Sequence, residues 1–168
     1  MSNKQMGFIE ISVGIIRVLG FNAAYLLTHL IDCLESGGDP AETESEGYQL
    51  IKDEDGKVWC RQSYECLIRN IYLPRHTLMR TKKFLEQEGL IEVRQGVTNE
   101  WRIIEDKVTR LYQFASMFHP ANAPVNEDSF PKWEAWKKEH PKIVKEFWHL
   151  AKGMDKLKLR TWSETYFH

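Results

Sequence analysis

The sequence lacks the patterns that identify membrane proteins, secreted proteins and most enzymes. No apolar run approaches the roughly 18 residues that a membrane-spanning helix needs. The first residues lack the charged-then-apolar layout of a secretory signal, so we expect a cytoplasmic protein without membrane contacts. The sequence has no glycine-rich phosphate loop, no His-x-His or His-Glu-x-x-His pattern and no Gly-x-Ser-x-Gly motif. We therefore expect neither a catalytic site nor a bound cofactor.

Cysteine is scarce. The 168 residues contain three, Cys33, Cys60 and Cys66, and no Cys-x-x-Cys pair. An odd number without a regular framework predicts reduced, mostly buried thiols. The alternative is a zinc site formed by Cys60, Cys66 and His76, but their spacing matches no zinc motif, so we expect no metal.

An excess of one charge sign is also lacking, since 23 lysines and arginines meet 24 acids for a formal net charge of −1. The distribution is uneven, however. Residues 35–55 contain eight acids and one base, whereas residues 57–110 contain eleven bases and seven acids. Residues 132–160 contain nine bases and four acids. An acidic connector therefore separates two mildly basic regions, an asymmetry that favours contact with an anionic partner.

The chain is long enough for one domain and an extension. Because 42% of the residues are hydrophobic and 12% are aromatic, a packed core is expected. We predict a domain over residues 1–105, containing an acidic loop at 35–47, and a helical extension over 106–168. Residues 13–19 favour a short helix that Gly20 ends. Asn22 favours the cap of a longer helix whose leucines share one face.

The middle of the chain predicts alternating strands and helices. Asp-Gly at 55–56 is typical of a hairpin turn between strands at 48–52 and 57–61. A short helix follows from Ser63, and Pro74 suits the first turn of a longer one that Gly89 ends. Strands are then expected at 90–94 and 100–104, joined by a turn at 95–99.

The C-terminal third predicts a helix at 108–118, a linker at 119–124 and a basic helix pair over 132–154 interrupted by Pro141. Four tryptophans lie in this third. They either offer a surface to a protein partner or a second copy of the chain, or form a helical cap that completes the core. The tryptophans are Trp133, Trp136, Trp148 and Trp162.

Five segments carry a family resemblance, namely residues 22–27, 55–63, 73–80, 84–93 and 99–103. They resemble the winged helix-turn-helix superfamily, in particular the N-terminal domains of phage and plasmid replication initiator or replisome-organiser proteins. The resemblance covers residues 8–105. It implies an α+β fold with an N-terminal helix, a helix-turn-helix, a two-stranded wing and a helical C-terminal extension.

The resemblance also implies a function. We expect sequence-specific binding of double-stranded DNA in replication initiation of a phage or mobile element, with a nucleoid location when bound. Two alternatives remain, a transcriptional regulator of the same fold and a docking module that binds a protein instead of DNA. A homodimer is a further open possibility, because a helix-turn-helix that binds a palindrome does so in pairs.

The predicted second helix of the motif supplies the main candidate contacts. Helical spacing puts His76, Arg80 and Lys83 on one stripe, whereas Leu78, Thr81 and Leu85 lie on the opposite, packed stripe. Arg80 is the strongest candidate, because arginine binds guanine or phosphate through two parallel hydrogen bonds. An exposed basic face without a ligand is the alternative. The candidates on this helix are Arg75, His76, Thr77, Met79, Arg80 and Lys83.

Two further groups complete the predicted DNA contacts. Arg94, Gln95 and Thr98 in the wing are placed to reach the backbone or the minor groove, unless the wing is a plain solvent-exposed hairpin. Arg61, Gln62 and Ser63 precede the first motif helix, where backbone N–H groups commonly hold a phosphate; simple capping by Ser63 is the alternative. Trp59 and Trp101 are expected to pack in the core rather than to stack on bases.

Overall fold

The computed structural model describes residues 10–35, 47–118 and 129–153. Within them the chain is an α+β protein with seven helices and one four-stranded antiparallel sheet. The chain divides into two compact units. The first contains Phe21–Val108, and the second contains Ser12–Gly20 together with the described residues from Thr109 onward.

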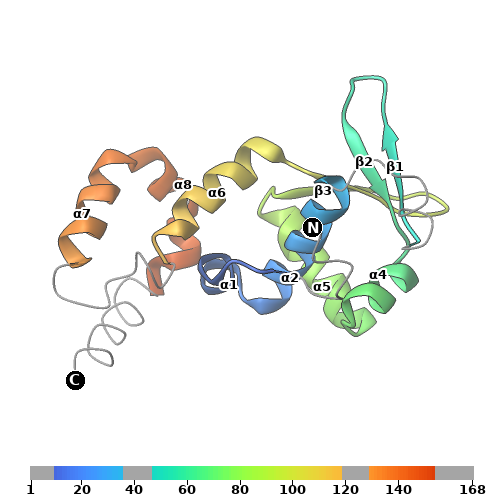
Figure 1. Cartoon of the computed structure of the whole chain (residues 1–168), viewed down its shortest axis with the longest axis horizontal. Coiled ribbons are helices and arrows are strands. Elements are labelled where there is room, and N and C mark those ends of the chain that lie inside the picture. The colour runs from blue at the N-terminus through green and yellow to red at the C-terminus, as the bar shows by residue number, and fades with distance from the viewer. Residues whose placement is uncertain (1–9, 36–46, 119–128, 154–168) are drawn as a thin grey trace. The chain divides into compact units, whose positions relative to one another are not determined.

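The sheet and three helices belong to the first unit (Figure 1). The strand order is β1-β2-β4-β3, so the predicted β3–β4 hairpin pairs along β4 with the β1–β2 hairpin. The two strands expected as a wing are therefore half of a four-stranded sheet. The helices are α2 (Phe21–Glu35), α4 (Tyr64–Ile71) and α5 (Arg75–Gln87), and the strands are β1 (Gln49–Lys52), β2 (Val58–Arg61), β3 (Ile91–Arg94) and β4 (Glu100–Ile103).

Helix α2 supplies the apolar face on which this unit is assembled. It begins at Phe21, one residue before the predicted cap Asn22, directly after Gly20 with its φ of +85°. Leu27 and Leu30 are buried, as their helical spacing predicts. The helix packs against α5 and against strands β2 and β4.

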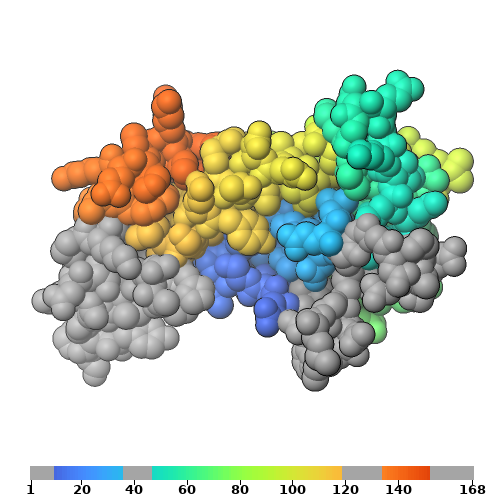
Figure 2. Space-filling view, turned by 45° about the horizontal axis from the view of Figure 1, so that its top comes forward, coloured from blue at the N-terminus to red at the C-terminus, as the bar shows by residue number. Residues whose placement is uncertain are grey.

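The β1–β2 hairpin is closed by the predicted Asp-Gly turn. A carboxylate oxygen of Asp53 accepts hydrogen bonds from the backbone N–H groups of Asp55 and Lys57, both at 2.9 Å. Gly56 takes a φ of +80°, which glycine adopts without steric cost. In the space-filling view this teal hairpin and the yellow-green turn after β3 both lie at the surface (Figure 2).

Helices α4 and α5 are joined by a turn of three residues. Ser63 caps α4, since its hydroxyl accepts from the backbone N–H of Cys66 at 3.1 Å. Pro74 directly precedes α5 instead of lying in its first turn, and its side chain makes no capping hydrogen bond. Gly89 follows α5 with a φ of +69°, which agrees with its predicted role as the stop of this helix.

The second unit is helical. Its described helices are α1 (Val13–Leu19), α6 (Glu105–Ser116), α7 (Ser129–Glu139) and α8 (Pro141–Gly153), of which α6 begins in the first unit. The predicted helix pair interrupted at Pro141 is confirmed as α7 and α8. Helix α1 groups with this unit, whereas the sequence predicts it in a domain ending at residue 105; the division falls after Val108.

An aromatic cluster forms the core of the second unit. The ring centre of Phe114 lies 5.2 Å from that of Phe118, 5.8 Å from Phe147 and 6.2 Å from Trp136. The half-buried Trp136 thus packs against this cluster within the second unit. Trp162 and the predicted linker at 119–124 lie outside the described residues.

In the part of the chain that the structure describes, each helix is too short or too polar to cross a membrane.

Candidate nucleic-acid interface

Helix α5 has the two faces that its sequence predicts. Leu78, Thr81 and Leu85 are buried, because this side of the helix packs in the first unit. Most of the candidate contact residues face solvent, and Met79 is 49% exposed. Only Thr77 is half-buried, with its carbonyl accepting from the Thr81 hydroxyl at 2.7 Å. The exposed candidates are Arg75, His76, Met79, Arg80 and Lys83.

The cations on α5 differ in their surroundings. Among the described residues, the exposed side chains of Arg80 and Lys83 form no ion pair or hydrogen bond. Lys82, next in sequence, is only 13% exposed and binds Glu86 at 3.2 Å. Partial burial acts to lower the pKa of Lys82, but its hydrogen bonds to Glu86 and Tyr64 raise that pKa on balance. Lys82 is thus a neutralised cation, whereas Arg80 and Lys83 are available to an anion.

Arg75, in the first turn of α5, is held by the neighbouring helix α4. Its guanidinium lies 3.1 Å from the carboxylate of Glu65 and 5.4 Å from the ring centre of Tyr64. Both side chains of the ion pair are largely exposed, so the pair is weak and exchangeable. Arg75 is therefore held beside α4 but remains accessible to an anion.

Two predicted contact residues, the wing residue Arg94 and Arg61 before the first motif helix, share one carboxylate. Glu100 in β4 pairs with Arg61 of β2 at 3.0 Å and with Arg94 of β3 at 2.9 Å. The strand register explains this arrangement, because Glu100 stands opposite Arg61 on one side and opposite Arg94 on the other. Glu100 is 16% exposed and the two arginines are 46% and 44% exposed. The three side chains form a cross-strand Arg-Glu-Arg row with a net charge of one.

Arg94 is restrained a second time by an aromatic ring. Its guanidinium carbon lies 3.8 Å from the ring centre of Trp59, and that of Arg102 lies 5.5 Å away. The indole N–H of Trp59 donates to Asp53 at 2.8 Å, and this hydrogen bond lowers the pKa of Asp53. Trp59 and Trp101 are both buried, which confirms the prediction that they pack.

The structure corrects the prediction for Gln62. Its side chain is fully buried at the junction of β2 and α4, so it makes no contact with a ligand at the surface. The amide oxygen lies 3.3 Å from His29, and the amide nitrogen donates to Cys66 at 3.6 Å. Its backbone carbonyl accepts from the Trp101 indole at 2.8 Å, and its N–H donates to Asn99. Gln62 is therefore an internal hydrogen-bonding centre.

The remaining predicted residues divide between capping and exposure. Ser63 is half-buried and acts as the cap of α4, so its hydroxyl is already engaged. Gln95 is exposed in the β3–β4 turn, and Thr98 in the same turn is half-buried. Val97 between them is fully exposed. An exposed apolar tip and a polar neighbour suit contact with a groove, although the turn itself carries no charge.

The three cysteines are buried thiols outside any disulfide, as expected. A hydrogen bond with Cys60 and burial both raise the pKa of Cys33, which keeps this thiol protonated. The alternative zinc site is not formed, because His76 is exposed on α5 whereas Cys60 and Cys66 are buried. Within the described ranges no three His, Cys, Asp or Glu side chains converge to hold a metal.

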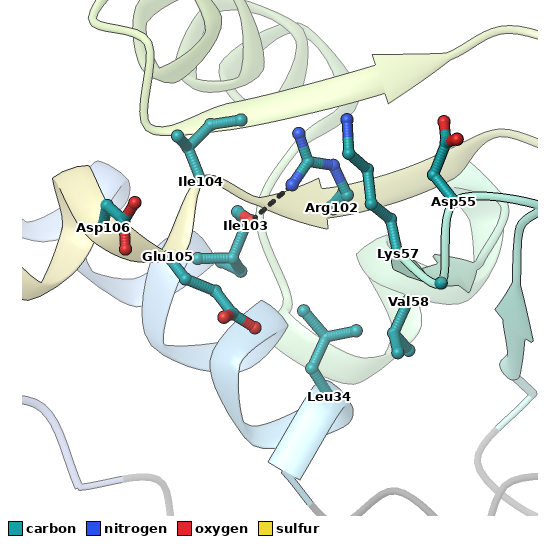
Figure 3. A pocket seen from close by; sticks show the side chains of 10 residues that line it. Leu34, Asp55, Lys57, Val58, Arg102, Ile103, Ile104, Glu105 and Asp106 are labelled. Carbon is teal, nitrogen blue, oxygen red and sulfur yellow. Dashed lines mark hydrogen bonds between the residues drawn. The ribbon is translucent and has the colours of Figure 1, made fainter.

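A pocket of about 410 Å³ lies between the β1–β2 turn, β4 and the start of α6 (Figure 3). Its apolar lining comes from Leu34, Val58 and two isoleucines. Arg102 in its wall donates to the Ile103 carbonyl at 3.4 Å and also binds Glu92. Carboxylates outnumber cations around it, which disfavours a phosphate-bearing ligand. The charged lining residues are Asp55, Lys57, Arg102, Glu105 and Asp106.

Two residues relevant to the interface were not among the sequence candidates. Glu100 controls the availability of Arg61 and Arg94, but only the strand register reveals this. Tyr72, in the turn before α5, is 85% exposed and has a φ of +56°. The sequence carries no glycine or asparagine at this position to signal a left-handed residue.

Comparison with known proteins yields no relative: no protein-family model, no curated protein and no solved structure matches this chain.

Proposed function

We propose that this chain is a winged helix-turn-helix protein that binds double-stranded DNA. Helices α4 and α5 form the helix-turn-helix, α5 enters the major groove, and the β3–β4 turn is the wing. The observation that carries the proposal is the outward face of α5. This helix has four bases and one acid, and its Arg80 and Lys83 are exposed without partners among the described residues.

The dimensions and chemistry of DNA support this assignment. A major groove about 12 Å wide admits one helix, and its base edges present acceptors that arginine recognises. Arg80 is assigned to a guanine or a phosphate, and Lys83 to a phosphate. Neutralising phosphates with free cations releases bound counterions, which drives binding even for a protein whose net charge is near zero.

The family resemblance indicates the cellular process in which the proposed DNA binding takes part. It favours replication initiation of a phage or mobile element, with transcriptional regulation by the same fold as the alternative. Sites repeated near the element's own origin support replication, whereas a site in its own promoter supports regulation. A docking module that binds a protein is the second candidate. It is favoured by one observation, the internal pairing of Arg61, Arg75 and Arg94.

Selection of bound duplexes from a genomic pool tests the proposal. Wild type and Lys82→Met are expected to enrich the same duplexes, whereas Arg80→Ala/Lys83→Ala enriches none. The Lys82→Met variant removes one positive charge from the same helix but leaves the exposed face intact. If wild type enriches no duplex and instead retains one protein through high-salt washes, the docking function replaces DNA binding.

A further inference from the structure

Tyr72 has a backbone conformation that its residue type does not favour. It terminates α4 with φ +56° and ψ +27°, and its N–H donates to the Ile68 carbonyl at 2.8 Å. It is the one non-glycine residue with positive φ in the part of the chain that the structure describes. Glycine, and less often asparagine, occupies such positions because a β-carbon crowds the backbone there. Folding alone would therefore select glycine or asparagine.

Among the described residues, the Tyr72 side chain forms no hydrogen bond, ion pair or ring stacking that compensates for this strain. Its one electrostatic neighbour among them is Tyr25 on α2, whose pKa is raised by burial and then by the Tyr72 phenol. The side chain of Tyr72 is 85% exposed. Its hydroxyl forms no hydrogen bond, and its ring makes no aromatic contact, within the described ranges. Two other tyrosines of this unit differ, since Tyr64 packs edge-on against Trp101 and Tyr25 stacks on Phe21. A strained backbone whose side chain is this exposed, and which forms no hydrogen bond or ring stacking among the described residues, points to a role outside the fold.

The position of Tyr72 indicates what that role is. It lies three residues before Arg75, the first residue of α5, and the exposed Arg75 and His76 follow it at the start of that helix. If α5 enters a major groove by its N-terminus, the preceding turn lies over the sugar-phosphate backbone at the groove edge. Tyrosine hydroxyls are common donors to phosphate oxygens in such interfaces.

We propose that Tyr72 is a DNA-backbone contact whose hydroxyl donates to a phosphate oxygen beside the entry point of α5. This inference rests on the proposed function and adds a residue to its binding surface. A contact to a phosphate strengthens binding to every sequence similarly. Because tyrosine is uncharged, this contact releases no counterion. The strain at Tyr72 is retained because the side chain acts on the ligand.

Two substitutions separate the hydroxyl from the backbone effect. Tyr72→Asn relieves the left-handed strain, so its melting temperature is expected to rise by about 2 °C above wild type. The same variant loses the phosphate contact, and its affinity for a selected duplex is expected to fall roughly tenfold. Tyr72→Phe keeps the ring and the strain, so its melting temperature stays unchanged while its affinity falls roughly fivefold. The salt dependence of binding stays at the wild-type value in both variants.

Fluorescence anisotropy with the full chain and a labelled duplex, together with thermal melting, gives these readouts. A lower melting temperature for Tyr72→Asn contradicts the proposal, because the ring then serves folding. Wild-type affinity in Tyr72→Asn overturns the contact while leaving DNA binding by α5 intact. Loss of self-association in this variant assigns the ring to a second copy of the chain instead. If wild type itself binds no duplex, the Tyr72 contact and the proposed function are both rejected.

Discussion

The outward face of α5 and the Arg-Glu-Arg row of the sheet carry similar numbers of cations but offer them differently. On α5, Arg80 and Lys83 face solvent without partners in the described part of the chain. In the sheet, Arg61 and Arg94 are both bound to Glu100, and Arg94 also lies over Trp59. A phosphate reaches the first pair directly but has to displace a carboxylate to reach the second.

If the chain binds DNA as proposed, this difference indicates where the binding energy arises. The Glu100 pairs are half-exposed on the arginine side, and ion pairs at the surface contribute about 0.2–1 kcal/mol each. They are therefore breakable, but breaking them offsets part of any gain from a phosphate. The stacking of Arg94 on Trp59 adds about 0.5–1 kcal/mol to be lost if the arginine is redirected. We infer that α5 supplies most of the affinity and that the row in the sheet adjusts it.

Removing both free cations of α5 has the largest expected effect. Arg80→Ala/Lys83→Ala is predicted to lower duplex affinity by about 100-fold, because a base or phosphate contact of arginine contributes about 1–3 kcal/mol. The melting temperature stays near that of wild type, since both side chains are exposed. Anisotropy titration and thermal melting measure the two quantities. A loss of affinity in Lys82→Met in proportion to the one charge that it removes would show that only overall charge matters.

Gln62 and Gln95 separate a structural glutamine from an exposed one. Gln62→Ala is predicted to lower the free energy of unfolding by about 2 kcal/mol, because His29 and Cys66 lose a buried hydrogen-bonding partner. Gln95→Ala, with the same substitution in the exposed β3–β4 turn, leaves stability unchanged. Urea denaturation provides the comparison. Equal stability of both variants would contradict the hydrogen-bonding role assigned to Gln62.

Removing the negative charge of Glu100 leaves Arg61 and Arg94 without their carboxylate partner, so the cations of the sheet become as available as those of α5. Glu100→Gln releases Arg61 and Arg94, and we expect duplex affinity to rise about three- to tenfold because more cations meet phosphate. Stability changes by about 1 kcal/mol, because the arginine side of both pairs is half-exposed. Glu92→Gln, on the neighbouring strand, is the control for a general gain of charge. An unchanged affinity in Glu100→Gln would remove the row from the interface.

The smallest expected effect is on the stability of the fold at acidic pH. The Trp59 indole hydrogen bond lowers the pKa of Asp53 below its ordinary value. Ionised Asp53 therefore stabilises the β1–β2 hairpin above about pH 4, and this contribution is lost as the pH falls through the lowered pKa of the folded state. Asp53→Asn is expected to flatten the dependence of stability on pH in this acidic range. Thermal melting between pH 2.5 and 5 measures it, and a wild-type pH profile for the variant would contradict the effect.

Local rules were sufficient for most elements of the first unit. Asp-Gly at 55–56, Ser63 and Gly89 each act through a hydrogen bond or a backbone angle that involves close neighbours in the sequence, and each has its predicted role. The inward face of α5 also follows from helical spacing. Pro74 differs by one residue, because proline suits both the cap and the first turn of a helix.

The candidate site was less predictable because its decisive contacts are distant in sequence. The buried Gln62 is hydrogen-bonded to His29, 33 residues earlier, which no local pattern indicates. Glu100 meets Arg61 only through the pairing of β2 with β4, so their mutual neutralisation depends on strand order. Tyr72 takes a left-handed conformation that its residue type opposes, and local propensity therefore points the wrong way.

Adjacent lysines on α5 provide the sharpest test of this surface. The slope of log affinity against log salt concentration counts the phosphates that the protein neutralises, at about 0.9 for each contact with a duplex. Lys83→Met is predicted to reduce the slope by about one, and Lys82→Met to leave it at the wild-type value. Identical slopes for the two variants, or no measurable DNA binding by wild type, would contradict the assignment of α5 as the DNA-binding helix.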